Sequence, residues 1–215
     1  MKIKFNVMAF LLIATVLSGC GWNGGSKKFD FGHIEQNKYI NSYFGMELVI
    51  PDGWVARTRK ETRKMVNMLY DTVVKNDIKP RVKASEINTA DLLSIFKYKI
   101  GTSKEYNPGL MLIATNLKNA PHTKTGSDYL SFVRKYLKQR QEVHYMHIDE
   151  TSKKVMINNQ PFYSMSCTIN IGININQEYY STVKDGFSMN VIITYANEQQ
   201  KKELENIIHS IKFNH

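Results

Sequence analysis

The sequence predicts an α+β fold in which an antiparallel sheet is flanked by about three helices. Apolar and polar residues alternate along several short segments, most clearly between residues 143 and 195, and this period of two is typical of half-buried strands. Turn pairs such as Asn158-Asn159 and Asp185-Gly186 separate neighbouring strands closely enough to favour antiparallel pairing. Three other segments show the spacing of amphipathic helices.

The composition fits one packed domain. Of the 215 residues, 42% are hydrophobic and 11% are aromatic, which suits a sizeable core and argues against disorder. The chain has two cysteines, Cys20 and Cys167. Because Cys20 is the predicted lipid attachment site, Cys167 has no partner within the chain, and stability must come from packing rather than from disulfides.

Residues 1–19 are predicted to be a signal peptide. Lys2 and Lys4 precede an apolar run over residues 7–17, whose eleven residues cover roughly 16 Å, about half of a ~30 Å hydrocarbon core. A permanent membrane-spanning helix is therefore disfavoured. The following Leu17-Ser18-Gly19-Cys20 resembles the lipobox of bacterial lipoproteins. This resemblance implies cleavage between Gly19 and Cys20 and a diacylglyceryl group on the Cys20 thiol. The alternatives are an ordinary cleaved signal that ends near a cysteine, or a non-secreted buried helix.

The lipobox predicts a lipid-anchored protein on the extracytoplasmic side of the cell membrane, in the periplasm or at the cell surface. Two or more acyl chains hold a protein stably to a bilayer, whereas one chain does not. Gly21 follows the cysteine where an inner-membrane retention signal would have Asp, so transfer to an outer membrane would be allowed. Cleavage removes Lys2 and Lys4 and lowers the formal net charge from +10 to +8.

Residues 20–41 are predicted to form the lipidated cysteine and a flexible tether, and residues 42–215 a single α+β domain. The tether prediction depends on Gly21, Gly24, Gly25 and Ser26, followed by mostly polar residues. About twenty such residues span roughly 25 Å on average.

The domain is predicted to open with a half-buried strand on which Phe44, Met46, Leu48 and Ile50 alternate, followed by a turn at Pro51-Asp52-Gly53 and then Trp54. This opening resembles that of the PsbP/Mog-like superfamily, which includes the DcrB-like lipoproteins. The resemblance implies an α/β/α sandwich, an accessory or partner-binding role, and no common catalytic residues.

Residues 60–76 are predicted to form a helix, because Met65, Met68, Leu69, Thr72 and Val73 share one face. This face is interpreted as core packing, with an adaptable ligand-binding surface as the alternative. Segment 57–83, which contains the helix, holds nine basic and three acidic residues. It is either a solvated face or a surface for an anionic partner, such as lipid headgroups, wall polymer or an acidic envelope protein. The candidate residues of this basic surface are Arg57, Arg59, Lys60, Arg63, Lys64, Lys79, Arg81 and Lys83.

Two strands, over residues 92–100 and 110–115, come next, joined by a turn at Asn107-Pro108-Gly109. The second is apolar on both faces, which places it centrally in the sheet. A helix then begins after Thr125, with Asp128 as a capping-box partner, and ends near Gln141. Its predicted buried side consists of Tyr129, Val133, Tyr136 and Leu137.

Short strands are predicted over residues 143–148 and 154–157, before a long alternating run over residues 163–176. Gly172 is predicted to bend or bulge this run, and Cys167 to be a buried, unreactive thiol on its apolar face. Strands over residues 178–183 and 187–195 form a hairpin. Asn197, with Gln200, caps a final helix whose apolar stripe is Leu204, Ile207, Ile208 and Ile211.

The sequence predicts no catalytic residue, metal site or cofactor. His144 and His147 lie three apart on a predicted strand, so their side chains point to opposite faces. Asp149-Glu150 is an acidic pair beside a turn, the kind of pair that is almost always solvated. No nucleophile elbow, zinc-binding motif or phosphate-binding glycine loop is present in the sequence. Nucleic acid is disfavoured as a partner by the predicted location and by the lack of a basic-aromatic motif.

These observations predict a non-catalytic binding, docking or accessory module of the cell envelope. Its predicted partners are the membrane, through the lipid on Cys20, and an anionic envelope component. The alternatives are an enzyme of an unrecognised type and a structural or assembly subunit of an envelope complex.

Overall fold

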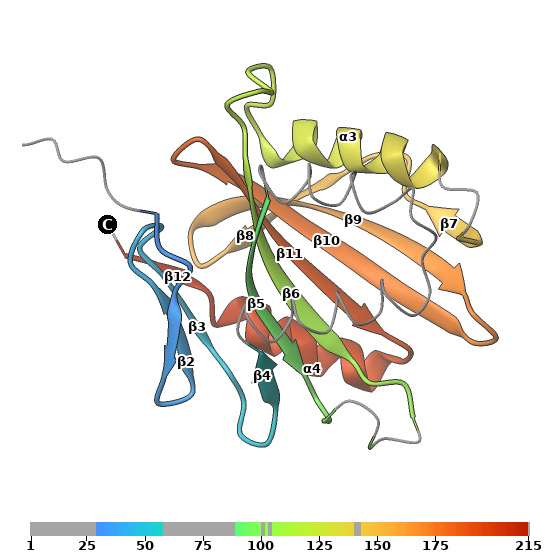
Figure 1. The fold of residues 1–215 in the computed structure, drawn as a ribbon. Coiled ribbons are helices and arrows are strands. Elements are labelled where there is room, and N and C mark those ends of the chain that lie inside the picture. The colour runs from blue at the N-terminus through green and yellow to red at the C-terminus, as the bar shows by residue number, and fades with distance from the viewer. Residues whose placement is uncertain (1–28, 58–88, 100–101, 103–104, 140–142, 215) are drawn as a thin grey trace, which may run out of the picture.

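A computed structural model describes residues 29–57, 89–99, 102, 105–139 and 143–214, and these residues form two antiparallel sheets (Figure 1). The smaller sheet has the order β1-β2-β3-β12, with β1 at His33–Glu35, β2 at Lys38–Asn41, β3 at Met46–Val49 and β12 at Lys212–Phe213. The larger sheet has the order β4-β5-β6-β11-β10-β9-β7, and β8 also pairs with β9. Its strands are β4 (Val55–Arg57), β5 (Thr89–Phe96), β6 (Gly109–Asn116), β7 (Tyr145–Ile148), β8 (Lys153–Ile157), β9 (Gln160–Asn170), β10 (Asn174–Lys184) and β11 (Phe187–Tyr195).

The predicted sheet-rich, antiparallel class is confirmed. The described residues contain two helices, α3 at Gly126–Gln139 and α4 at Glu198–His209. The helix predicted over residues 60–76 lies outside the described residues. The sandwich with about three helices therefore remains a prediction.

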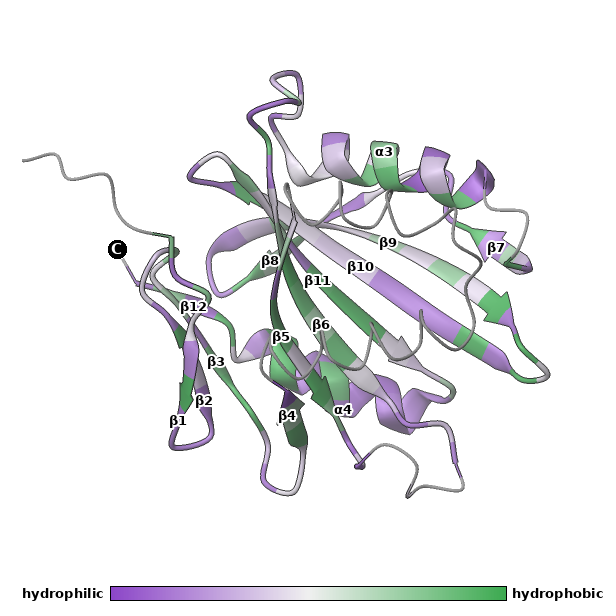
Figure 2. Cartoon of the chain, in the orientation of Figure 1, coloured by the Kyte–Doolittle hydropathy of each residue, from purple (hydrophilic) through white to green (hydrophobic). Residues whose placement is uncertain are grey.

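One face of the large sheet forms the main core together with α4 and the smaller sheet. Met189, Val191 and Ile193 alternate on β11 and are buried on this face, as predicted. The apolar stripe predicted for the last helix, whose final member Ile211 lies just beyond α4, and the alternating residues of the opening strand are buried in the same cluster: Leu204, Ile207, Ile208, Ile211, Phe44, Met46, Leu48 and Ile50. Figure 2 shows that hydrophobic residues are concentrated on β5, β6 and β11, which confirms the central position predicted for β6.

The other face of the large sheet carries α3, which packs across β9 and β10. Leu130 and Leu137 are fully buried there against Met165 and Cys167. Tyr136, predicted to be on the buried side, is instead 51% exposed. Gly126, Leu130 and Leu137 are the buried positions of the helix, with the partly buried Val133 on the same side, and this rotation of the helix turns Tyr136 toward solvent.

Both predicted helix caps are confirmed. Thr125 and Asp128 bond reciprocally: the Thr125 amide donates to the Asp128 carboxylate (2.8 Å), and the Asp128 amide donates to the Thr125 hydroxyl (3.2 Å). Hydrogen bonds from the amide of Lys124 and from Thr125 hold the pKa of Asp128 below its usual value. At α4, the Gln200 amide donates to Asn197 Oδ1 (3.0 Å), while Gln200 Oε1 accepts from the amide of Ala196 (2.8 Å), one residue before the cap.

The predicted single long strand over residues 163–176 is wrong. The chain reverses at residues 171–173, and β9 and β10 form a hairpin whose register places Asn170 opposite Asn174. Gly172 has a φ of +94° and lies in the turn, where Ile171 and Ile173 are 67% and 51% exposed. The turn has three residues, so Ile175 after it lies opposite Ile169 before it, on the same face of the sheet. The apolar residues therefore keep odd numbers on both strands, and the sequence pattern resembles that of one long strand. Cys167 is buried as predicted, and burial raises the pKa of its thiol to about 12.

The tether predicted over residues 20–41 extends too far. Residues 33–41 form the β1–β2 hairpin, and β2 pairs with β3. Phe29 and Phe31 pack against the main core, so the domain includes every described residue from Phe29 onward. The strand predicted over residues 92–100 is also misplaced: β5 ends at Phe96, and the side chain of Asn107 then bonds both the N–H and the C=O of Tyr98.

Candidate functional site

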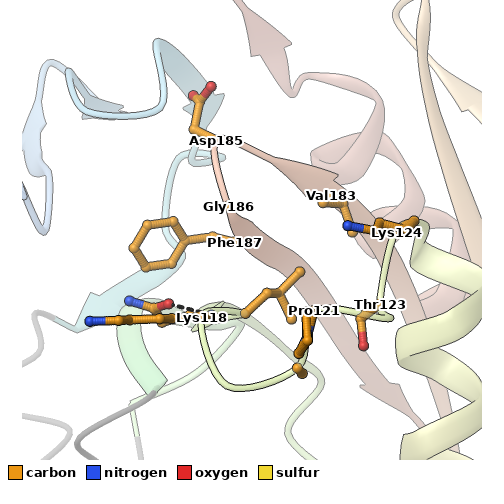
Figure 3. A pocket seen from close by; sticks show the side chains of 11 residues that line it. Lys118, Pro121, Thr123, Lys124, Val183, Asp185, Gly186 and Phe187 are labelled. Atoms are coloured by element: carbon orange, nitrogen blue, oxygen red, sulfur yellow. Dashed lines mark hydrogen bonds between the residues drawn. The ribbon is translucent and has the colours of Figure 1, made fainter.

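A pocket of about 540 Å³ lies between the loop after β6 and the turn that joins β10 to β11 (Figure 3). The loop contributes Leu117, Lys118, Pro121 and Lys124, among others, and the β10–β11 hairpin contributes Val183, Asp185, Gly186 and Phe187. The two segments lie side by side because β6 and β11 are neighbours in the sheet, with Phe187 opposite Asn116.

Local hydrogen bonds define the shape of both walls. The amide of Leu117 donates to the carbonyl of Gly186 (2.9 Å), which ties the loop to the hairpin turn. The amide of Lys118 donates to Asn116 Oδ1 (2.8 Å), and the amide of Ala120 donates to the carbonyl of Leu117 (2.8 Å). Asp185 and Gly186 have φ values of +50° and +77°, so the Asp-Gly pair forms the tight turn that the sequence predicts.

The Phe187 wall of the pocket continues into an aromatic cluster. The ring centroid of Phe187 lies 5.5 Å from Phe29, 5.7 Å from Tyr43 and 5.4 Å from Phe44. Aromatic pairs at these separations stabilise a packed cluster beyond the area they bury. Phe29, the first residue that the structure describes, therefore packs directly behind the pocket.

The pocket combines an apolar interior with two lysines. Figure 3 shows Lys118 below the Phe187 ring and Lys124 beside Val183, with Pro121 between them, while the carboxylate of Asp185 points away. An apolar interior with a few charged groups at its edge is the usual composition of a small-molecule site. The arrangement suits an amphiphilic anion, whose charge would bind the lysines and whose apolar part would contact Pro121 and Phe187.

A second polar cluster is buried between β10, β11 and α4. Glu178 Oε1 accepts from the hydroxyl of Tyr195 (2.6 Å) and from Lys201 Nζ (2.8 Å), and Oε2 accepts from the hydroxyl of Tyr180 (2.6 Å). Burial raises the pKa of Glu178, but the hydrogen bonds from Lys201 and the two tyrosines outweigh it, so the pKa is lowered. Burial and the adjacent carboxylate raise the pKa of both tyrosines. Within the described residues, no buried side-chain nitrogen or oxygen lacks a hydrogen-bond partner, so this cluster is structurally satisfied.

Most of the predicted site residues lie outside the described part of the chain. These are Gly19 and Cys20 at the N-terminus, and the basic surface except Arg57. Arg57 is on β4, and its guanidinium carbon lies 5.8 Å from the centroid of the Phe96 ring. The lipid attachment and the basic surface therefore remain predictions.

His147 and the acidic pair have structural partners. His147 Nε2 lies 2.9 Å from Asp149 Oδ1, and Asp149 also accepts from the amide of Ser166 (2.8 Å). Glu150 forms an exposed ion pair with Lys138 (2.8 Å). Among the residues that the structure describes, no group of three or more His, Cys, Asp or Glu could hold a metal ion. In the same residues no helix has the length and apolar character needed to span a bilayer.

Sequence reasoning missed the pocket and β12. Lys118 and Lys124 flank a turn-rich loop with Pro121, which is unremarkable by itself. The Asp185-Gly186 turn was predicted, but the sequence does not indicate that the two segments meet.

Comparisons with known proteins give structural likenesses at low identity. No protein-family model and no curated protein sequence matches the chain. Solved structures similar to it include the cyanobacterial PsbP protein CyanoP from Synechocystis (12% identity, TM-score 0.45, covering 82% of this chain and 91% of that one). A second is a protein from Bacteroides thetaiotaomicron (10% identity, TM-score 0.43, covering 85% of this chain and 50% of that one). A third is LpqN of Mycobacterium tuberculosis, described as involved in cell envelope biogenesis (11% identity, TM-score 0.41, covering 78% of this chain and 82% of that one). With TM-scores below 0.5, these likenesses assign no activity, ligand or location to this chain.

Proposed function

We propose that this chain is an extracytoplasmic, membrane-anchored binding module that takes an amphiphilic anion in the pocket between the β6–α3 loop and the β10–β11 turn. The observation that carries the proposal is the pocket itself, with Lys118 and Lys124 at the edge of an apolar interior. Opposite charge and apolar contact act together in such a site, so it selects molecules that have both properties.

The membrane anchor in this proposal is the lipid on Cys20, supported by the lipobox Leu17-Ser18-Gly19-Cys20. Replacing Cys20 by serine removes the acceptor thiol, so we expect the variant to leave the membrane fraction for the soluble fraction or to keep its leader. Ser18→Ala keeps a small residue before the cleavage site and is the matched control, expected to stay in the membrane. A mature wild-type protein whose mass lacks acyl chains would contradict the anchor.

The pocket's charge preference can be tested with anilinonaphthalene sulfonate, a fluorescent apolar anion. We expect the double variant Lys118→Glu/Lys124→Glu to weaken binding of this probe about tenfold or more at low salt, because attraction becomes like-charge repulsion. The measurement is a fluorescence titration of the purified full chain.

The matched control for the pocket is Lys135→Glu/Lys153→Glu, which reverses two exposed lysines on α3 and β8 and leaves the pocket unchanged. If both double variants weaken binding of the probe equally, the probe responds to the net charge of the protein, and the proposal that the pocket binds an anion is contradicted. The basic surface of segment 57–83 remains a second proposed contact for anionic partners.

A further inference from the structure

We infer that the pocket end of the domain faces the anchoring bilayer, and that the amphiphilic anion is the headgroup of an anionic phospholipid in that bilayer. This inference rests on the proposed function and adds an orientation and a ligand class. It follows from the position of Phe29 beside the pocket, the length of the large sheet and the charges at one of its ends.

The entry point limits how far the pocket can lie from the lipid. Eight residues, 21–28, separate the proposed anchor at Cys20 from Phe29, and the nine residue steps span at most about 30 Å. Phe29 is held against Phe187 by ring contact at 5.5 Å. The next residue is also held, because the carboxylate of Asp30 accepts from the amides of Gly32 (2.9 Å) and Ser42 (3.3 Å). The short connection therefore ends on the pocket wall rather than at a distant surface.

The two ends of the large sheet are far apart. Strand β10 runs from Asn174, beside the exposed turn of Ile171 and Ile173, to Lys184, beside the pocket. Its ten residue steps cover about 33 Å. Figure 1 shows the β10–β11 turn near the smaller sheet and the N-terminal entry, with the β9–β10 turn at the opposite end. If the strands of the large sheet run perpendicular to the bilayer, the β10–β11 turn contacts the bilayer and the β9–β10 turn does not.

The charges at the pocket end favour contact with anionic lipid. Lys118 and Lys124 line the pocket together with one acidic residue, Asp185, whose carboxylate points away from them in Figure 3. Lys184, at the end of β10, lies with its Nζ 5.7 Å from the centroid of the Phe213 ring. Basic groups close to an anionic leaflet are attracted within a distance of about 10 Å, the screening length in salt. The lysines would bind the phosphate, and the pocket interior would contact the glycerol region.

The test uses the lipidated full chain in nanodiscs, with a fluorophore on one introduced cysteine. Cys20 carries the lipid and Cys167 is buried with a raised pKa, so an exposed new cysteine is labelled selectively. Ala120→Cys labels the pocket edge and Ile173→Cys labels the far turn, and phosphatidylcholine with a nitroxide headgroup quenches either label near the bilayer. In discs that contain phosphatidylglycerol, we expect quenching several-fold stronger at position 120 than at position 173.

Two comparisons separate headgroup binding from tethering alone. In discs of phosphatidylcholine without phosphatidylglycerol, or with Lys118→Glu/Lys124→Glu added, we expect the difference between the labels to fall sharply. Lys135→Glu/Lys153→Glu should preserve it. A difference that persists without phosphatidylglycerol would overturn the lipid ligand, and equal quenching at both positions or stronger quenching at position 173 would overturn the orientation. If the sulfonate probe still binds through the two lysines in such a case, the proposed function stands without its lipid ligand.

Discussion

Replacing Gly126 by alanine is expected to destabilise the protein by about 3 kcal/mol, the upper end of the ~1–3 kcal/mol usual for overpacking. Gly126 is buried at the start of α3, where the helix touches β10. A Cβ atom there would collide with the backbone carbonyl oxygen of Ser181. Backbone cannot rotate aside as a flexible side chain does, so α3 would have to move off the sheet.

The measurement for Gly126→Ala is urea unfolding of the purified full chain. Lys135→Ala, on the exposed side of the same helix, is the control and should change the free energy of unfolding by less than about 0.5 kcal/mol. An unchanged unfolding midpoint for Gly126→Ala would mean that α3 does not pack against Ser181 as described.

Replacing Glu178 by alanine is also expected to cost about 3 kcal/mol, the lower end of the ~3–5 kcal/mol found when one partner of a buried ion pair is removed. The substitution leaves the hydroxyls of Tyr180 and Tyr195 without their acceptor. It also removes the nearest counter-ion of Lys201, whose ammonium keeps only the longer pair with Glu205 at 3.9 Å. The lower end applies because the Lys201 side chain is 27% exposed, so water can solvate its charge in part.

Glu203→Ala is the matched control for Glu178. It removes the Lys97–Glu203 pair (2.7 Å), which also joins α4 to the rest of the domain but is partly open to water. A loss below about 1 kcal/mol is expected there. Equal losses for the two variants would show that the Glu178 cluster contributes no more than a surface pair.

The Glu178 cluster also sets part of the acid sensitivity of the fold. Because the folded pKa of Glu178 is lowered, its carboxylate stabilises the protein above the unfolded value of about 4.3. That contribution is lost as the pH falls from there through the folded pKa. We therefore expect the stability of Glu178→Gln to depend less steeply on pH below about 4.3 than that of the wild type.

Local signals in the sequence predicted the elements that local chemistry determines. Asn158-Asn159 and Asp185-Gly186 form the expected tight turns, with positive φ at all four residues. Asn197 caps α4 as expected, because a cap involves only residues three or four apart. The same locality explains the misread run over residues 163–176, since a turn of three residues preserves the alternation on which the strand prediction depended.

Features built from distant segments could not be predicted. The pocket joins Lys118 and Lys124 to Phe187, across more than sixty residues of sequence. The exposure of Tyr136 follows from the close approach of Gly126 to Ser181, which only the packed structure reveals. The start of the domain was placed too late, because Phe29 and Phe31 are isolated aromatics in a polar segment whose partners lie elsewhere in the chain.

The smaller sheet is built from both ends of the domain, and this has a consequence for biogenesis. β12 pairs with β3, and the amide of Val49 donates to the hydroxyl of Ser210, 161 positions away in sequence. Contacts of such high sequence separation form slowly, because a long loop must close first. The sheet cannot be completed during synthesis until residues 212–213 have emerged from the ribosome. Until then, the edge of β3 that pairs with β12 stays unpaired in the nascent chain, and such an exposed strand edge is a binding site for chaperones.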